Sequence, residues 1–264
     1  MLDSLVLFAT LGAALAVMGS TWVLSVALRD ASIADIAWGV TFIAIAWMAQ
    51  VVGDGSGTRS LVITLLVTVW GMRLAGWISI RHDGEDTRYA AMRERHGDDF
   101  VRRSLWSVFG LQALIAWVVS LPIQAAASDG SPETLGGLVY LGFLVFFVGL
   151  AFEALADAQL ERFKRNPLNE GAVLASGLWR YSRHPNYFGD ACVWWGIWLI
   201  ALDTGSAWWT AIGPALMTFL LLRVSGVALT ERTIAERRPG YAEYARSTSA
   251  FVPRPPRGRQ GGEA

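Results

Sequence analysis

The sequence predicts an all-α integral membrane protein with about seven transmembrane helices. Of the 264 residues, 53% are hydrophobic and 13 are tryptophan, and the mean hydropathy is +0.39. Several uncharged stretches approach the ~20 residues that cross a bilayer as a helix, which a soluble domain of this length does not need. The predicted spans cover residues 4–28, 33–52, 60–80, 105–127, 134–158, 186–202 and 207–228.

The charges between these spans predict their orientation, because short cationic loops stay in the cytoplasm. Lysine and arginine concentrate in alternate connections: 81–104, 159–185 and the chain after residue 228. The other connections are nearly free of them: 53–59, 128–133 and 203–206. An odd number of spans, with the N-terminus outside and the C-terminus inside, satisfies the rule, although the 29–32 connection carries Arg29 alone.

The pattern indicates one membrane domain, residues 1–252, followed by a disordered cytoplasmic tail, residues 253–264. The tail is rich in Pro, Gly and Arg, a composition that cannot bury a core. The N-terminus lacks a basic region and a small-residue cleavage site, so we expect a first span rather than a signal peptide. The single cysteine, Cys192, falls in an apolar span, where we expect a small buried side chain.

Several charged residues fall within the predicted spans, where charges are costly and face a cavity or a partner. Asp35 lies near the start of the second span, and Arg73 about two turns from the end of the third. Glu153 and Asp157 are four residues apart in the fifth and share a helix face. Structural ion pairs between helices, such as Arg73 with Asp157, are one explanation. A polar cavity that opens to the cytoplasm and accepts an anionic cofactor is the other.

The densest polar stretch is residues 177–190, at the start of the sixth span. Pro185 suits the first turn of a helix, where its missing N–H costs nothing. The free N–H groups of that turn, with Arg183 and His184 beside them, can hold a phosphate or carboxylate. Further polar side chains project from the same turn: Asn186, Tyr187 and Asp190. A capped helix end with snorkelling side chains is the simpler alternative, but the density of hydrogen-bonding groups favours a binding site.

The sequence lacks the familiar cofactor motifs. It has no Gly-x-Gly-x-x-Gly after a strand, no Walker loop and no Cys/His cluster for zinc, so we expect no metal. The net charge of zero provides no basic field for nucleic acid. We therefore expect the partners to be a lipid-soluble small molecule and the membrane lipids, while the oligomeric state stays open, with a monomer as one option.

Two groups of motifs carry a resemblance to a known family. The first comprises Gly177-Leu178-Trp179, Tyr181-Ser182 and Pro185-Asn186-Tyr187-x-Gly189-Asp190. The second comprises Gly240-Tyr241-x-x-Tyr244 and Phe251-x-Pro253. Together they resemble the steroid 5α-reductase superfamily, in particular its bacterial DUF1295 branch. The resemblance implies a seven-helix membrane fold that uses NADPH to reduce an activated C=C bond, in the cytoplasmic membrane of a bacterium or, for a eukaryotic relative, the endoplasmic reticulum.

The resemblance assigns roles to individual residues. Asn186 and Asp190 match residues that contact the nicotinamide nucleotide, and Arg73 matches a cofactor-binding arginine of the third helix. Asp157 and Lys164 resemble an acid and a base that bind adenosine and its phosphates. The remaining residues implied at the cofactor are Arg88 and Tyr89 in the 3–4 loop, Arg183 and His184 beside the phosphates, and Arg223, Glu231, Tyr241 and Tyr244 in the closing wall.

The chain departs from this family at the catalytic acid. Steroid reductases carry a Tyr on the third helix where this chain has Trp70, which cannot donate a proton, and Asp35 stands in place of their second-helix Glu. We expect Asp35, if burial keeps it protonated, to polarise a substrate carbonyl, with Tyr187 as the second candidate acid. A steroid substrate is correspondingly doubtful.

A second family shares part of the pattern. Isoprenylcysteine and phospholipid methyltransferases also carry an Arg-His-Pro-x-Tyr-x-Gly run, a later Glu and a Tyr-x-x-Tyr, and they use these residues for S-adenosylmethionine. Arg183, His184 and Pro185 fit them equally well. Asn186 and Asp190 favour the reductase, because the methyltransferase pattern does not need both.

Overall fold

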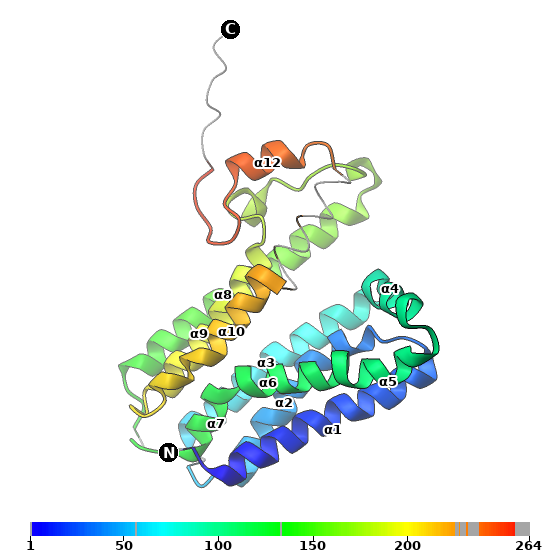
Figure 1. Ribbon diagram of the computed structural model, residues 1–264. Helices are drawn as coiled ribbons and strands as arrows, with labels where there is room; N and C mark the ends of the chain where they lie inside the picture. Colours follow the sequence, from blue (N-terminus) through cyan, green and yellow to red (C-terminus); the bar gives the residue numbers. More distant parts are fainter. Residues whose placement is uncertain are drawn as a thin grey trace. The chain divides into compact units, whose positions relative to one another are not determined.

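The computed structural model describes residues 2–55, 57–132, 134–224, 227, 231 and 238–256. Within these ranges the regular secondary structure is helical and no strand occurs, as the sequence predicted (Figure 1). Four helices are long and apolar enough to cross a membrane: α1 (Ser4–Leu28), α2 (Ile33–Val52), α3 (Thr58–Arg81) and α8 (Gly137–Arg165). These helices indicate an integral membrane protein.

A fifth candidate span is bent. The helical run from Thr87 to Val119 is followed by α7 (Leu121–Ser128) after a break at Ser120. The axis of α7 is bent by 49° from that of the preceding run. Pro122 lies in the first turn of α7, where a proline has no N–H to donate to the preceding turn. With this bent pair the described residues contain up to five spans by length and composition, so the predicted count of seven stays a prediction.

Shorter apolar helices occupy the last two predicted spans. They are α9 (Pro185–Leu202) and α10 (Ile212–Phe219), which follows a 3₁₀ turn at Trp208–Ala211 and continues as a π-helical segment, Leu220–Val224. Residues 225, 226 and 228 of the predicted seventh span lie outside the described residues. Residues 257–264 of the predicted tail do so as well, so its predicted disorder stays untested.

The chain divides into two compact units, and the single membrane domain expected for residues 1–252 stays a prediction. Unit 1 comprises residues 1–139 and 197–213, and unit 2 comprises residues 140–196 and 214–264. Hydropathy marks which segments are buried in the membrane, but it carries no signal for which helices pack on one another.

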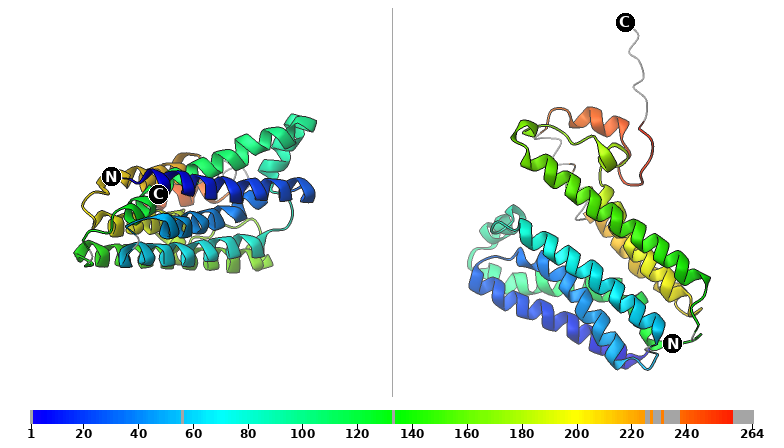
Figure 2. Two further views of the ribbon diagram at one scale, coloured as in Figure 1. Left: turned by 90° about the horizontal axis from the view of Figure 1, so that it is seen from below. Right: turned by 180° about the vertical axis from the view of Figure 1, so that it is seen from behind.

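Unit 1 is a helical bundle in which α1, α2, α3 and α6 (Leu111–Val119) run side by side (Figure 2). α2 and α3 approach closely at Gly39 and Gly71, where a Cβ built on Gly39 would lie 2.6 Å from the Gly71 carbonyl oxygen. Near this crossing the rings of Phe42 and Trp70 lie edge to face with their centroids 5.6 Å apart, and both side chains are fully buried. Small residues at the crossing let the apolar faces interlock, as in other membrane helix pairs.

A buried ion pair closes one end of unit 1. Arg59, near the start of α3, places Nη2 3.0 Å from Asp203 Oδ2, and only 4% and 8% of the two side chains are exposed. The same nitrogen donates to the Pro132 carbonyl at 2.8 Å, and the Gly136 N–H donates to Asp203 at 3.0 Å. This clasp joins three segments that are distant in the sequence.

In unit 2, α8 and α9 pack through glycines. A Cβ on Gly189 would lie 2.5 Å from the Gly149 carbonyl oxygen and 2.6 Å from the Glu153 nitrogen. A Cβ on Gly196 would meet the Phe146 nitrogen at 2.6 Å. The two backbones therefore touch along one side of α9, which brings the polar residues of its first turns against α8.

Candidate functional site

The polar segment, residues 177–190, begins as a 3₁₀ turn, Gly177–Arg180, that is fixed by α8. Gly177 has φ +59°, and a Cβ there would strike the Gln159 side chain. Gln159 Oε1 accepts from the Leu178 N–H at 3.0 Å, and Trp179 Nε1 donates to the Ala156 carbonyl at 3.1 Å. The positive φ favours glycine at this position, and the Gln159 side chain occupies the space that a Cβ would take.

The C-terminal region fixes the next part of the polar segment. The Arg183 N–H donates to the Ser249 carbonyl at 2.8 Å, and Ser182 Oγ donates to the Phe251 carbonyl at 2.7 Å. The Tyr244 hydroxyl, on α12 (Tyr241–Ser247), donates to the carbonyl oxygen of Trp179. The two groups of motifs that the sequence analysis singled out therefore form one structure.

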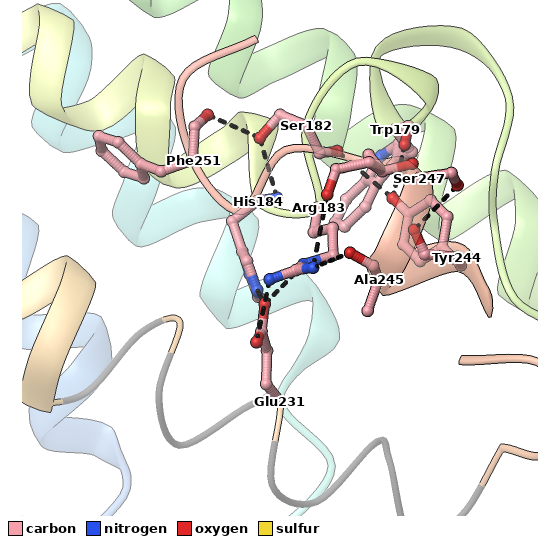
Figure 3. Close-up of polar contacts among 10 residues, drawn as sticks. Trp179, Ser182, Arg183, His184, Glu231, Tyr244, Ala245, Ser247 and Phe251 are labelled. Atoms are coloured by element: carbon pink, nitrogen blue, oxygen red, sulfur yellow. Dashed lines mark hydrogen bonds and ion pairs between the residues drawn. The ribbon is translucent and has the colours of Figure 1, made fainter. Parts of the chain in front are cut away.

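Arg183 and His184 converge on one carboxylate, that of Glu231 (Figure 3). Arg183 Nε and Nη2 lie 2.8 and 3.2 Å from the two Glu231 oxygens, and His184 Nε2 lies 3.2 Å from Oε1. Arg183 Nη1 also donates to the Ala245 carbonyl at 2.6 Å. The guanidinium that the sequence assigned to cofactor phosphates is therefore engaged in an internal bidentate pair.

Burial sets the protonation of the groups around this pair. Burial lowers the pKa of His184, an effect that Glu231 opposes and Arg183 reinforces, so the imidazole is neutral near pH 7. Burial also raises the pKa of Tyr241 to about 12 and raises that of Tyr244 further. Both phenols thus stay protonated, and His184, stacked on Tyr187 at 5.4 Å, presents a neutral ring.

A row of polar side chains lies where α8 meets α9. Asn186 Nδ2 donates to Asp157 Oδ1 at 3.2 Å, and one turn earlier on α8 Glu153 packs against Gly189. Glu153 is 4% exposed and Asp157 is 6% exposed. Asn186 Oδ1 is buried and has no hydrogen-bond partner among the described residues. A buried acceptor of this kind calls for a donor from a ligand or from water.

The other residues predicted for unit 2 lie on the same elements. Asp190 follows Asn186 by one turn of α9, Lys164 is exposed in the last turn of α8, and Arg223 is exposed in the π-helical end that follows α10. The Tyr241 and Tyr244 rings meet at 5.9 Å on α12, which carries them against the polar segment.

Asp35, Arg73 and Tyr89 belong to unit 1. The Asp35 carboxylate accepts from the Tyr89 hydroxyl at 2.8 Å and from Arg88 Nη2 at 2.9 Å, and Gln112 Nε2 lies 3.4 Å from the same hydroxyl. The sequence suggested a protonated Asp35 in a cavity. In the structure its partners are a cation and a phenol from α4 (Thr87–His96). Arg73 lies on α3, and the predicted site residues are therefore divided between the units.

A second polar cluster in unit 1 was not predicted. Asp30, between α1 and α2, accepts from Ser32 and lies 2.7 Å from His82 Nε2. Burial by itself raises the pKa of Asp30, but the hydrogen bonds from Ser32 and His82 outweigh it and hold the pKa below its ordinary value of 3.8. Arg93 lowers the pKa of Glu85 in the same way, through two hydrogen bonds at 2.7 and 3.0 Å.

The sequence did hold a signal for the Arg59 clasp. Arg59 is the one cation in the connections 53–59, 128–133 and 203–206, which also contain acids. A lone cation among acids is expected to pair, but the sequence does not say with which acid. No group of three or more His, Cys, Asp or Glu able to hold a metal occurs in the part of the chain that the structure describes.

The fold and these polar residues define the class as a helical integral membrane protein with a polar row buried between two of its helices. Residues 21–248 match the family DUF1295, which is described as a protein of unknown function. The match covers most of the chain, so the chain belongs to this family.

Two relatives extend the comparison. A Ustilaginoidea virens protein named "Probable O-methyltransferase ustE" is 41% identical over 65 residues, which is 24% of this chain and 23% of that relative. A Schizosaccharomyces pombe protein, "Uncharacterized protein C594.04c", is 24% identical over 267 residues, covering 88% of this chain and 75% of its own length. No solved structure shows significant similarity to the chain.

Proposed function

We propose that the protein is a membrane-embedded reductase that uses NADPH to saturate an activated C=C bond in a lipid-soluble substrate, as its resemblance to the steroid 5α-reductase superfamily implies. The observation that carries the proposal is the Asn186 carboxamide. Its Oδ1 is buried without a partner in the described residues, while its Nδ2 is fixed by Asp157. A fixed, buried acceptor suits the carboxamide N–H₂ of a nicotinamide.

The neighbouring residues also fit such a cofactor. Buried carboxylates, such as those of Glu153 and Asp157, accept hydrogen bonds from ribose hydroxyls in many dinucleotide sites. The bound cofactor supplies the hydride, and the chain supplies binding, orientation and exclusion of water. Asp157 fixes the Asn186 amide, and the close α8–α9 contact at Gly189 holds the polar side chains of the two helices against each other.

One of the predicted phosphate ligands has partners within the protein. Arg183 is paired with Glu231 and with the Ala245 carbonyl, so we assign it to holding the polar segment on the C-terminal region. The phosphate roles that the resemblance implies for Lys164 and Arg223 of unit 2 and for Arg73 of unit 1 stay predictions. We retain Asp35 and Tyr187 as the candidate acids. To donate a proton to a substrate carbonyl, Asp35 would have to exchange its ion pair with Arg88, at 2.9 Å, for the substrate.

A second candidate function is an S-adenosylmethionine-dependent methyltransferase. The relative named as a probable O-methyltransferase favours it. The burial of Glu153 and Asp157 favours it too, because buried carboxylates stabilise a sulfonium and an ammonium group. The cations near the site favoured NADPH over S-adenosylmethionine, because NADPH carries phosphates. The pairing of Arg183 with Glu231 weakens that argument.

For either activity we propose seven spans with the N-terminus outside and the C-terminus inside, in the cytoplasmic membrane of a bacterium. The charged connections 81–104 and 159–185 support this orientation through the positive-inside rule. α9 and α10 would then complete the seven spans begun by the longer helices.

Thermal unfolding of the purified protein in detergent, with NADPH, NADH or S-adenosylmethionine, tests the proposal. A ligand that binds only the folded state raises Tm. At one hundred times its Kd, it adds about 2.7 kcal/mol to the free energy of unfolding. We expect a shift with NADPH. The Asn186→Ala variant should lose it, whereas Asn169→Ala, which removes an amide of unit 2 outside the polar segment, should keep it. A shift with S-adenosylmethionine alone would replace the reductase by the methyltransferase.

A further inference from the structure

A pocket of about 290 Å³ lies in the C-terminal region of unit 2, apart from the α8–α9 row. It is lined by the last turn of α12 and the loop that follows, residues 245–250, together with Arg254 and Pro255. Its volume is close to the lower end of the roughly 300–1,000 Å³ typical of small-molecule sites. Neither sequence motifs nor family resemblance pointed to it.

The charged residues that line the pocket are both cationic. Arg246 and Arg254 contribute guanidinium groups, Ser249 contributes a hydroxyl, and no acidic residue lines the pocket. Among the residues that the structure describes, neither arginine is paired with a carboxylate, and Arg246 makes only a 3.3 Å hydrogen bond from Nε to the Ala242 carbonyl. Two cations and no acid on the lining favour an anionic ligand.

The wall of the pocket is held in place by the polar segment. The Ser249 carbonyl accepts from the Arg183 N–H at 2.8 Å, and the Arg254 N–H donates to the Tyr181 carbonyl at 3.0 Å. Arg183 Nη1 binds the Ala245 carbonyl at 2.6 Å. These bonds fix the backbone on both sides of the pocket, so the Cα positions of the two arginines are held and only their side chains have to be ordered by a ligand.

We propose that this pocket binds a phosphate monoester. Guanidinium groups form bidentate, charge-assisted hydrogen bonds with phosphate oxygens, and a dianion neutralises both arginines at once. The pocket is larger than one phosphate group requires, so it leaves room for the sugar or headgroup that carries the phosphate. The monoester can belong to a nucleotide or to a phosphorylated lipid headgroup, and the proposal does not depend on the proposed reductase activity.

Two pairs of probes isolate the phosphate. Adenosine 2′-monophosphate is compared with adenosine, and nanodiscs containing phosphatidylinositol 4-phosphate are compared with nanodiscs containing phosphatidylinositol. In each pair only the monoester differs. Binding of each probe is measured on the purified full-length protein, with inorganic phosphate as a competitor.

We expect the protein to prefer the phosphorylated member of at least one pair, and the preferred pair identifies the carrier. Arg246→Gln and Arg254→Gln should each weaken that binding about tenfold, the value of one charge-assisted hydrogen bond. Arg180→Gln removes an equally exposed arginine of the same unit outside the pocket and should leave the affinity within about twofold. Both pocket arginines are exposed, so their variants should keep the Tm of the wild type.

The proposal is wrong if neither monoester is preferred, or if the pocket variants bind like Arg180→Gln. These outcomes separate it from the reductase proposal. Stabilisation by NADPH that depends on Asn186 but not on Arg246 or Arg254 would keep the reductase and remove the phosphate pocket. Monoester binding without any NADPH effect would do the reverse.

Discussion

Arg59 is the cation whose loss should cost the fold most, because its partner Asp203 is also buried. We predict that Arg59→Met lowers the free energy of unfolding by about 3–5 kcal/mol, since Asp203 would keep an uncompensated charge. The double variant Arg59→Met/Asp203→Leu should lose much less. Denaturation of the purified protein in detergent measures both.

The control for this variant is Arg102→Met. Arg102 is exposed in α5 (Phe100–Ser104) and should change stability by no more than about 0.5 kcal/mol. Equal stability of Arg59→Met and Arg102→Met would contradict the importance of the clasp.

The local polar density around Arg183 and His184 predicted a binding site, and that assignment stays a prediction. The bidentate partner of Arg183, Glu231, is 48 residues away, and hydrogen-bond distances to it follow only from the tertiary fold. The sequence could list cations and acids, but it could not decide that Arg183 is engaged by Glu231 rather than open to a phosphate.

At the scale of helices, the contact between α8 and α9 depends on Gly189. We predict that Gly189→Ala destabilises the protein by about 1–3 kcal/mol, because the new Cβ would collide with the backbone of Gly149 and Glu153. Thermal and chemical denaturation measure the loss. Gly12→Ala in α1 is the matched control: nothing lies within 4 Å of its Cβ, so alanine should be neutral or stabilise the helix by up to about 1 kcal/mol.

The same variant distinguishes a packing role of Gly189 from a role in ligand binding. If Gly189→Ala were as stable as Gly12→Ala but lost ligand binding, the glycine would act at the ligand rather than in helix packing. The structural assignment would then be wrong.

Helix bounds followed from the sequence where long apolar runs end at clear polar residues. The predicted spans 4–28 and 33–52 coincide with α1 and α2. The span predicted at 105–127 is bent at Ser120, as a proline inside a span favours, and Pro122 lies in the first turn of α7. α8 extends beyond the predicted span to Arg165. Hydropathy marks only the apolar part of a helix, whereas the charged residues after it can keep the helical conformation.

At the scale of the whole molecule, orientation is open to a direct test. We predict that a cysteine at Asp54 reacts with a membrane-impermeant maleimide in intact cells, whereas one at Asp98 reacts only after permeabilisation. Both positions are exposed and lie in connections predicted on opposite sides. The background is Cys192→Ser, which removes the one native thiol. Labelling of Asp98→Cys but not Asp54→Cys in intact cells would invert the topology.

The sequence by itself determined that the chain is helical and apolar enough for a membrane, and that polar groups gather around residues 177–190. These properties follow from composition and local order along the chain. The tertiary structure decided the pairing of Arg183 with Glu231, of Asp35 with Tyr89 and Arg88, and of Arg59 with Asp203. It also divided the chain into two units. The reason is physical: hydropathy reports how favourably each segment leaves water, whereas partner choice depends on distances between segments that are remote in sequence.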